Sequence, residues 1–474
     1  MMELWSNSKL EEIRNKSKIC AENFDKSTTI AEIHITNLTY AIIGGYDTMT
    51  YSKNLGISEV PRTTNIKGVW RWWTRAALAG AITCARGINN IDWNSVERVV
   101  KEKVKDLLGS TARSSKLAIE LDVNVKDDGL VPFKKLEKVP RIHLLSQPTK
   151  QEIEEMKRVT GITDKRTLKN MVKAEKLKLL KAYEPEALDI VLKVRAITLD
   201  LEKSEKEFLL RTLLLSLLFS GIGAITRRGF GSLTFKSVKS RFIPSHVINE
   251  IYGTKSTKDL ENTILRFIKD TISKALEILK LEVSSNCDLE GVPNYPILTL
   301  PVTEQMSPEK PYPTRLKVIQ IESDDVDILK IIGESTLKNV WKRIIRRKVS
   351  DHGKDLHTWV LGLPRDAAKR TGYLMRTDDS LKEARRASSI IIRPITKRDK
   401  QWYITILGFL SRDWPVKQLV HKSATSTRKV LDLPITSPIK SKIRSSKDVD
   451  NFVTSVFNSA FEFIIKSLKL YGGI

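Results

Sequence analysis

The sequence predicts a mixed α+β protein in which two units of related architecture follow one another along the chain. Strand and helix patterns occur in the order β-α-β-β-α-β between residues 33 and 238. That order is the split-βαβ, or ferredoxin-like, pattern, which RRM domains share. Further strands and helices follow residue 240, and 474 residues exceed the usual length of one domain. Architecture alone does not give a function.

The first unit, residues 1–240, is predicted from hydrophobic periodicity. Strands alternate polar and apolar or β-branched residues, whereas helices place apolar residues on one face, as Trp70, Trp73 and Ala77 do. Ser204 and Glu207 form a capping-box-like start to an apolar helix. A Lys/Glu-rich stretch at 150–183 is typical of an inserted surface helix. The predicted strands are 33–43, 115–125, 188–200 and 231–238, and the helices are 66–86 and 204–222.

The second unit, residues 241–474, is expected to be a more diverged ferredoxin-like domain. It mixes helices and strands again, but a proline-rich stretch at 293–313 interrupts it. No short repeat is visible. The predicted helices are 259–281, 326–348 and 447–469, and the predicted strands are 315–322, 388–395 and 402–409.

The charge balance favours a polyanionic partner. The chain has 81 Lys and Arg against 56 Asp and Glu, a formal net charge of +25. Such an excess favours nucleic acid first and an anionic membrane second. A surface adapted for solubility or for high temperature is the alternative, although the ion-pair-rich surfaces of thermophile proteins are usually close to balanced.

Composition also limits the compartment and the cofactors. The three cysteines, Cys20, Cys84 and Cys287, are too far apart for a zinc knuckle and too few for a disulfide framework. The polar N-terminus lacks a signal-peptide core, and the apolar stretch at 213–225 is shorter than the ~20 residues that span a bilayer. We therefore expect a cytoplasmic protein with no membrane partner, metal, cofactor or small-molecule substrate.

The first candidate RNA-binding cluster is the segment KGVWRWWTR. On a helix, Lys67, Arg71 and Arg75 share one face at ~6 Å per step, a spacing that suits successive phosphates. Trp72 lies beside this row and offers a face for base stacking. The alternative is an amphipathic helix with a solvated basic stripe and core tryptophans.

The second candidate cluster is the segment RRGFGSL between the apolar helix and the last strand. Its glycines permit positive φ, its arginines and N–H groups suit an anion, and its aromatic ring suits stacking. It lacks the Gly-Lys-Ser/Thr of a Walker A loop and the pattern of a Rossmann fingerprint. A tight helix-to-strand turn is the alternative. The candidate residues are Arg227, Arg228, Gly229, Phe230 and Gly231.

Two basic clusters lie in the second unit. Arg385 and Arg386 lead into a strand that carries Arg393, after a Leu-Gly-Leu-Pro element at 361–364. The other cluster, at 342–348, is expected to be mainly a solvated helix face.

Catalytic patterns are weak. The stretch SDHGKDLH at 350–357 does not have the spacing of a zinc-protease motif, and solvated loop residues explain it better than a metal site. His34 lies in the first strand and is a conceivable general base for metal-independent RNA cleavage. No Ser-His-Asp or Cys-His set is legible. An endoribonuclease and a scaffold for acidic proteins therefore remain as alternatives.

The segments IKGVWRWWTRAAL and RRGFGSL together resemble the RAMP superfamily of CRISPR effector proteins. The resemblance is greatest to the first-subunit family of the type III-B Cmr RNA-targeting complex. Gly44-Gly45 after the first strand and the Leu-Gly-Leu-Pro element also fit that family. Ser389 stands where the family pattern has proline, so the second-domain match is looser.

The resemblance implies two tandem ferredoxin-like domains in a crRNA-guided ribonucleoprotein complex. It implies contacts with the crRNA 3′ region, the target RNA and other Cmr subunits, with backbone cleavage belonging to another subunit. The RNA contacts would be those of the helix and the glycine loop, with Arg385, Arg386 and Arg393 as weaker candidates. Little base readout is expected, because guide pairing supplies specificity in RNA-guided systems.

Overall fold

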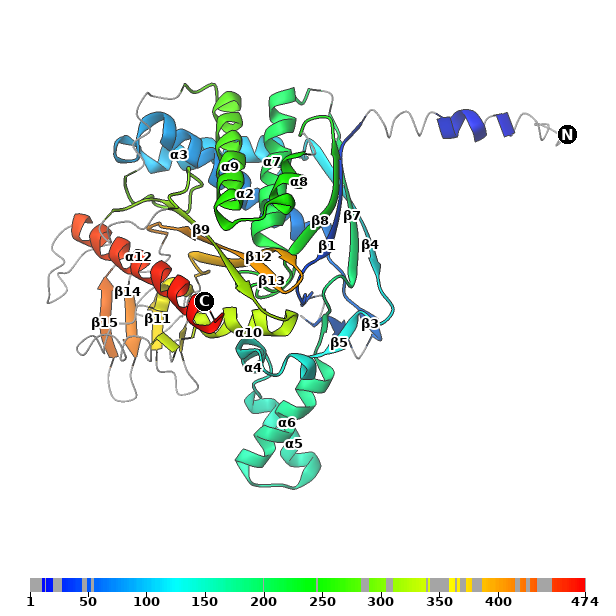
Figure 1. The fold of residues 1–474 in the computed structure, drawn as a ribbon, viewed down its shortest axis with the longest axis vertical. Helices are drawn as coiled ribbons and strands as arrows, with labels where there is room; N and C mark the ends of the chain where they lie inside the picture. The colour runs from blue at the N-terminus through cyan, green and yellow to red at the C-terminus, as the bar shows by residue number, and fades with distance from the viewer. Residues whose placement is uncertain are drawn as a thin grey trace.

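The computed structural model describes most of the chain. The described residues are 11–12, 14–19, 28–44, 49–52, 55–198, 200–243, 246–282, 290–303, 310–337, 340–341, 358–362, 365–366, 372–376, 386–413, 418–422, 427–432 and 446–473. Mixed helices and antiparallel sheets build the body, as the sequence predicted for the α+β class (Figure 1).

The first sheet has four antiparallel strands in the order β4-β7-β1-β8. Its strands are β1 (Thr29–Asn37), β4 (Leu117–Val125), β7 (Leu188–Ala196) and β8 (Leu233–Ser240). Two helices, α2 (Thr63–Arg86) and α7 (Lys203–Ser220), belong to the same unit. The chain order is therefore β-α-β-β-α-β, which confirms the predicted order of elements between residues 33 and 238.

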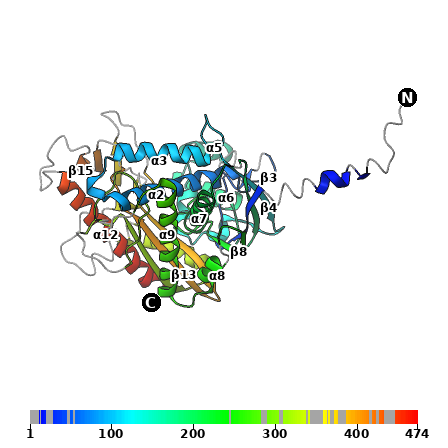
Figure 2. The same ribbon diagram turned by 90° about the horizontal axis from the view of Figure 1, so that it is seen from above.

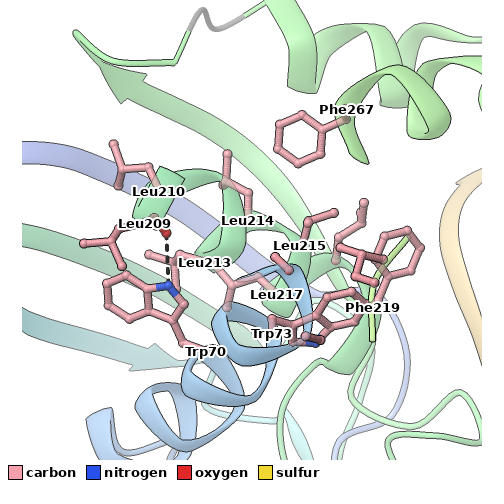
Figure 3. Close-up of a cluster of buried hydrophobic side chains, with 14 of the residues drawn as sticks. Trp70, Trp73, Leu209, Leu210, Leu213, Leu214, Leu215, Leu217, Phe219 and Phe267 are labelled. Atoms are coloured by element: carbon pink, nitrogen blue, oxygen red, sulfur yellow. Dashed lines mark hydrogen bonds between the residues drawn. The ribbon is translucent and has the colours of Figure 1, made fainter. Parts of the chain in front are cut away.

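The helix pair α2–α7 forms the centre of this unit. Trp70 and Trp73 project from α2 into the leucine-rich surface of α7 and have no exposed surface (Figure 3). Each indole also finds a polar partner: Trp70 Nε1 donates to the Leu209 carbonyl at 3.0 Å, and Trp73 Nε1 donates to Ser220 Oγ at 2.7 Å. Because α7 is apolar on nearly every side, it is buried between neighbouring elements.

The second sheet has three antiparallel strands in the order β12-β13-β9. They are β9 (Thr314–Glu322), β12 (Ile390–Arg398) and β13 (Gln401–Phe409), accompanied by α10 (Asp325–Ser335) and α12 (Ser446–Tyr471). Most residues of β12 and β13 are buried, so these strands lie inside the protein. The four predictions of strands 315–322, 388–395 and 402–409 and helix 447–469 are confirmed within a few residues.

A pair of helices links the two units. The helices α8 (His246–Gly253) and α9 (Thr257–Leu279) follow β8, and α9 packs on α2 and α7 as well as on β9. One cluster of buried side chains includes residues of α2, α7, α9, β9 and β13. Side chains from before and after the predicted boundary at residue 240 therefore share one buried cluster.

The predicted helical insertion at 150–183 consists of α5 (Lys150–Thr160) and α6 (Lys165–Leu179) and ends in the short strand β6 (Lys181–Tyr183). The helix α4 (Pro140–Leu145) precedes it. A capping box at Thr149 and Glu152 starts α5, and Gly161 ends it in the left-handed conformation. The α5–α6 hairpin projects away from the body, at the bottom of Figure 1.

Several elements differ from the sequence predictions. The first strand ends at Asn37, whereas the prediction ran to residue 43, and α10 ends at Ser335 instead of extending toward 348. Residues 342–357 lie outside the described part, so the basic cluster and the histidine-containing stretch there are not described. Cys84 is disulfide-bonded, which the sequence did not predict.

The remaining elements are small or were missed. The helix α3 (Trp93–Leu108) was not predicted; it lies alongside α2 (Figure 2). Also not predicted were β2 (Tyr51–Ser52), β3 (Ile57–Ser58), β5 (Leu130–Pro132), β6 (Lys181–Tyr183), β10 (Arg365–Asp366), β11 (Gly372–Arg376), β14 (Gln418–Lys422), β15 (Thr427–Asp432) and the 3-10 turns η1 (Ile88–Asn90), η2 (Phe133–Leu136) and η3 (Thr358–Leu361). None of the helices in the described residues has the length and apolar character needed to cross a bilayer.

Candidate nucleic-acid interface

The predicted row of cations lies on the accessible side of α2. Lys67 and Arg71 are half-buried, and Arg75 is exposed. None of the three forms an ion pair with a described residue; Arg71 instead donates to the Leu108 carbonyl at 3.2 Å, where α3 ends. Burial and the neighbouring Arg71 lower the pKa of Lys67, while burial and Arg75 lower the pKa of Arg71. The row is therefore a surface of mutually repelling positive charges that no described carboxylate pairs within ion-pair distance, although Glu97 lines the adjoining groove beside Arg75.

Trp72 lies next to this row but plays a different part from Trp70 and Trp73. Its ring is half-buried and packs edge-on against Trp73 and Phe409, each at a centroid distance of 5.3 Å. The guanidinium of Arg227 lies 5.9 Å from the Trp72 ring centroid, within the range of a cation–π contact. The α2 row and the glycine loop therefore meet at Trp72 and Arg227.

Arg227 is the arginine of the loop that keeps some solvent exposure. It donates to the Ser388 carbonyl at the start of the second sheet. Burial and the nearby Arg386 lower its pKa to about 10, although Asp413 acts in the opposite direction. A half-buried arginine with a lowered pKa beside another arginine is a favourable position for an anion.

The neighbouring loop side chains are not accessible, which corrects their predicted role as RNA contacts. Phe230 has 0% exposure, so it offers no stacking face. Arg228 is buried and donates to the carbonyls of Ile390 and Leu361, each at 2.9 Å. These two side chains join the glycine loop to the second unit.

Arg386 and Arg393 are also buried, which corrects the prediction that they face RNA. Arg386 forms an ion pair with Asp413 at 2.6 Å. Arg393 donates to the carbonyls of Leu218, Thr226 and Gly231, at 3.0, 3.4 and 2.8 Å. Desolvation lowers the pKa of Arg393 to about 9. Arg385, Leu363 and Pro364 lie outside the described residues.

The loop glycines are required by backbone geometry. Gly229 and Gly231 have φ values of +87° and +57°, in the region that favours glycine. A Cβ at Gly231 would lie 1.9 Å from the Ile222 carbonyl oxygen, and one at Gly229 would lie 2.9 Å from Ile332 Cδ1. The segment RRGFGSL is thus a tight turn that packs against both units, with Arg227 at its accessible edge.

Replacing Gly231 by alanine should therefore lower the free energy of unfolding by about 3 kcal/mol or more, because the added methyl meets backbone. Gly68, on α2, has nothing within 4 Å of an ideal Cβ. Gly68→Ala is the matched control and should stabilise the protein by ~0.5–1 kcal/mol, as in other helix interiors. Urea denaturation of both variants measures the difference. Equal stabilities would show that the turn does not need glycine.

A groove continues from the cation row. It has a volume of about 560 Å³, and its walls include Trp72 and Arg75 of α2, Lys101 of α3 and Tyr295. The buried Tyr295 hydroxyl has no hydrogen-bond partner among the described residues, and burial raises its pKa. The volume is within the range of ligand-binding clefts. Lys101 and Tyr295 were not predicted as site residues, because no local sequence pattern shows that their segments pack against α2.

His34, the candidate general base of the endoribonuclease alternative, pairs with an acidic side chain on its own strand. His34 lies on β1, with Nε2 3.1 Å from Glu32 Oε1, and Lys239 approaches the same carboxylate at 3.1 Å. The hydrogen bonds from Lys239 and His34 lower the pKa of Glu32. Within the described ranges, no group of three or more His, Cys, Asp or Glu side chains is arranged to hold a metal.

Comparison with known proteins finds a similarity in the first unit: residues 34–234 match the family model of the RAMP superfamily. The chain is also 24% identical over 281 residues to the "CRISPR system CMR subunit Cmr1" of Saccharolobus solfataricus. That alignment covers 47% of this chain and 57% of the relative, so the chain spans little more than half of the relative's length. The predicted resemblance to RAMP proteins and to the first Cmr subunit is confirmed.

Solved structures show a similar fold across most of the chain. One is a chain of a cryo-EM structure of "the Type III-B Cmr-beta bound to cognate target RNA and AMPPnP", state 2, in the presence of ssDNA. It has a TM-score of 0.51 at 15% identity and covers 93% of this chain and 100% of that chain. A chain of a cryo-EM structure of "the Type III-B Cmr-beta bound to cognate target RNA" has a TM-score of 0.50 at 15% identity, and the alignment covers 93% of this chain and 100% of that chain.

Proposed function

We propose that this protein is a non-catalytic RNA-binding subunit of a type III-B CRISPR (Cmr) effector complex. Its partners would be crRNA, near the 3′ region, target RNA and other Cmr subunits. The similarity to RAMP and Cmr proteins supports the complex. The observation that carries the RNA-binding role is the row Lys67, Arg71 and Arg75, which no described carboxylate neutralises and which continues to Trp72 and Arg227.

The proposed mode of binding is electrostatic. Successive cations on one helix face suit a phosphate backbone, and the half-buried Trp72 ring suits stacking of one base. Phosphate contacts and stacking do not depend on the identity of the base, so this surface would bind RNA with little sequence preference. Sequence discrimination would then come from guide pairing.

The two units are proposed to be tandem ferredoxin-like domains, 1–240 and 241–474. The order β4-β7-β1-β8 supports the first. In the second, β9, β12 and β13 take three of the four expected positions, with α10 and α12 as the helices. No described strand occupies the fourth position, beside β9, so the second domain would be a diverged version.

The test is an equilibrium RNA-binding assay on the full chain, combined with a cleavage assay in EDTA. We expect single-stranded RNA to be bound without being cut, with log affinity falling linearly as log salt rises. Cleavage of repeat RNA in EDTA that disappears in His34→Ala would favour the endoribonuclease alternative. Absence of RNA binding by both the isolated chain and the assembled complex would contradict the proposal.

A further inference from the structure

A second, strongly basic cavity lies away from the residues of the proposed RNA surface. Its volume is about 690 Å³, and α9, β9 and α12 provide most of its walls. Five cations line it: Lys258, Arg315, Lys317, Lys466 and Lys469. The carboxylates among the lining residues are Glu261 and Glu462.

The two carboxylates are already neutralised by two of the five cations. Lys317 Nζ lies 3.0 Å from Glu261 Oε1, and the same oxygen accepts the Val318 backbone N–H at 2.8 Å. Arg315 Nη2 lies 2.8 Å from Glu462 Oε1. Glu261 and Glu462 are therefore held by protein partners and are not free to neutralise further lysines.

Arg315 is held in place at the floor of this cavity. Its guanidinium lies 4.4 Å from the Phe461 ring centroid and also donates to Asn458 Oδ1 at 3.2 Å. The side chain is nearly inaccessible, and no described residue accepts a hydrogen bond from its Nε. Arg315 and Glu462 therefore form a fixed ion pair with no net charge, and the positive charge of the cavity comes from its lysines.

Three cations remain in surplus. Lys258 at the start of α9, and Lys466 and Lys469 on one face of α12, are exposed and form no ion pair with any described residue. The lining thus carries five positive and two negative charges, a formal surplus of +3. A concave surface with one sign of charge concentrates the opposite ion.

We propose that this cavity binds a phosphate-bearing ligand. Lys258, Lys466 and Lys469 would hold the phosphate groups, above a floor in which Arg315 and Lys317 are paired with Glu462 and Glu261. The cavity volume is within the range of small-molecule sites. The phosphate groups can belong to a free phosphorylated small molecule or to the phosphorylated end of an RNA strand.

The first test is calorimetric titration of the full chain with sodium pyrophosphate at low ionic strength. We expect saturable binding that weakens at least about tenfold when Lys466→Gln and Lys469→Gln are combined, since two charge-assisted contacts are lost. The matched control is Lys165→Gln with Lys169→Gln, exposed lysines spaced four residues apart on α6. It removes the same charge and should leave the dissociation constant within about twofold.

Competition then identifies the source of the phosphate. The measurement uses a chain carrying Arg71→Glu and Arg75→Glu, which removes the proposed RNA surface and should leave pyrophosphate binding unchanged. Displacement by ATP supports a small molecule, and displacement only by 5′- or 3′-phosphorylated RNA supports an RNA end. The proposal is overturned by absence of saturable binding, by equal weakening in the α6 control, or by failure of all these competitors. Each of these results leaves the RNA-binding proposal for α2 untouched.

Discussion

Combining Arg71→Glu with Arg75→Glu should weaken the binding of single-stranded RNA by about a hundredfold or more at low salt. Each substitution removes one charge-assisted phosphate contact, worth ~1.5–3 kcal/mol, and introduces repulsion. The slope of log affinity against log salt should become shallower by ~1.4, or ~0.7 per lost phosphate contact on a single strand. Fluorescence anisotropy with a labelled RNA over a range of salt concentrations measures both quantities.

The control for this prediction is Lys165→Glu with Lys169→Glu on α6. These lysines have the same spacing, are exposed and form no ion pair with a described residue. The same change of charge there should have a much smaller effect on affinity. Because Arg71 also donates to the Leu108 carbonyl, circular dichroism should show that both variants are folded. Equal losses in the two variants would mean that net charge, and not the α2 row, governs binding.

Replacing Arg393 by leucine should reduce the free energy of unfolding by about 3–5 kcal/mol. The guanidinium is completely buried and satisfies three carbonyls of the first unit from a strand of the second. Removing it leaves buried acceptors without donors and opens space beside Gly221, where the guanidinium now lies. Urea denaturation followed by tryptophan fluorescence measures the loss.

Arg75→Leu is the matched control for Arg393→Leu, because Arg75 is exposed on α2. It should change stability by less than about 0.5 kcal/mol while weakening RNA binding. Arg393→Leu should therefore lower mainly the stability, and Arg75→Leu should lower mainly the affinity for RNA. If Arg393→Leu is as stable as the wild type, then Arg393 is not the link between units that its contacts indicate.

The parts of the fold with strong local periodicity could be predicted from the sequence. The helix α2 carries tryptophan and alanine at helical spacing, and α7 is a long apolar run after a polar start, so both were found. The strands β7 and β13 are long and β-branched. By contrast, α3 has an ordinary amphipathic pattern between two loops, and short strands such as β5 and β6 are defined by their partners in space.

The candidate site was predictable only in part, for a physical reason. The sequence of an arginine- and glycine-containing segment is the same whether its guanidinium groups face a polyanion or the carbonyls of another part of the protein. In this structure Arg228 of the turn and Arg393 of β12 donate to carbonyls, whereas Arg227 remains at the surface beside Trp72. Only the three-dimensional arrangement separates these cases, because burial is decided by residues more than a hundred positions away.

The most direct test of the RNA surface is ultraviolet cross-linking of the full chain to single-stranded RNA, followed by mass spectrometry. We expect cross-linked peptides from α2, centred on Lys67 to Arg75, together with peptides containing Arg227. Cross-links confined to other segments, such as the α5–α6 hairpin, with none on α2, would contradict this expectation.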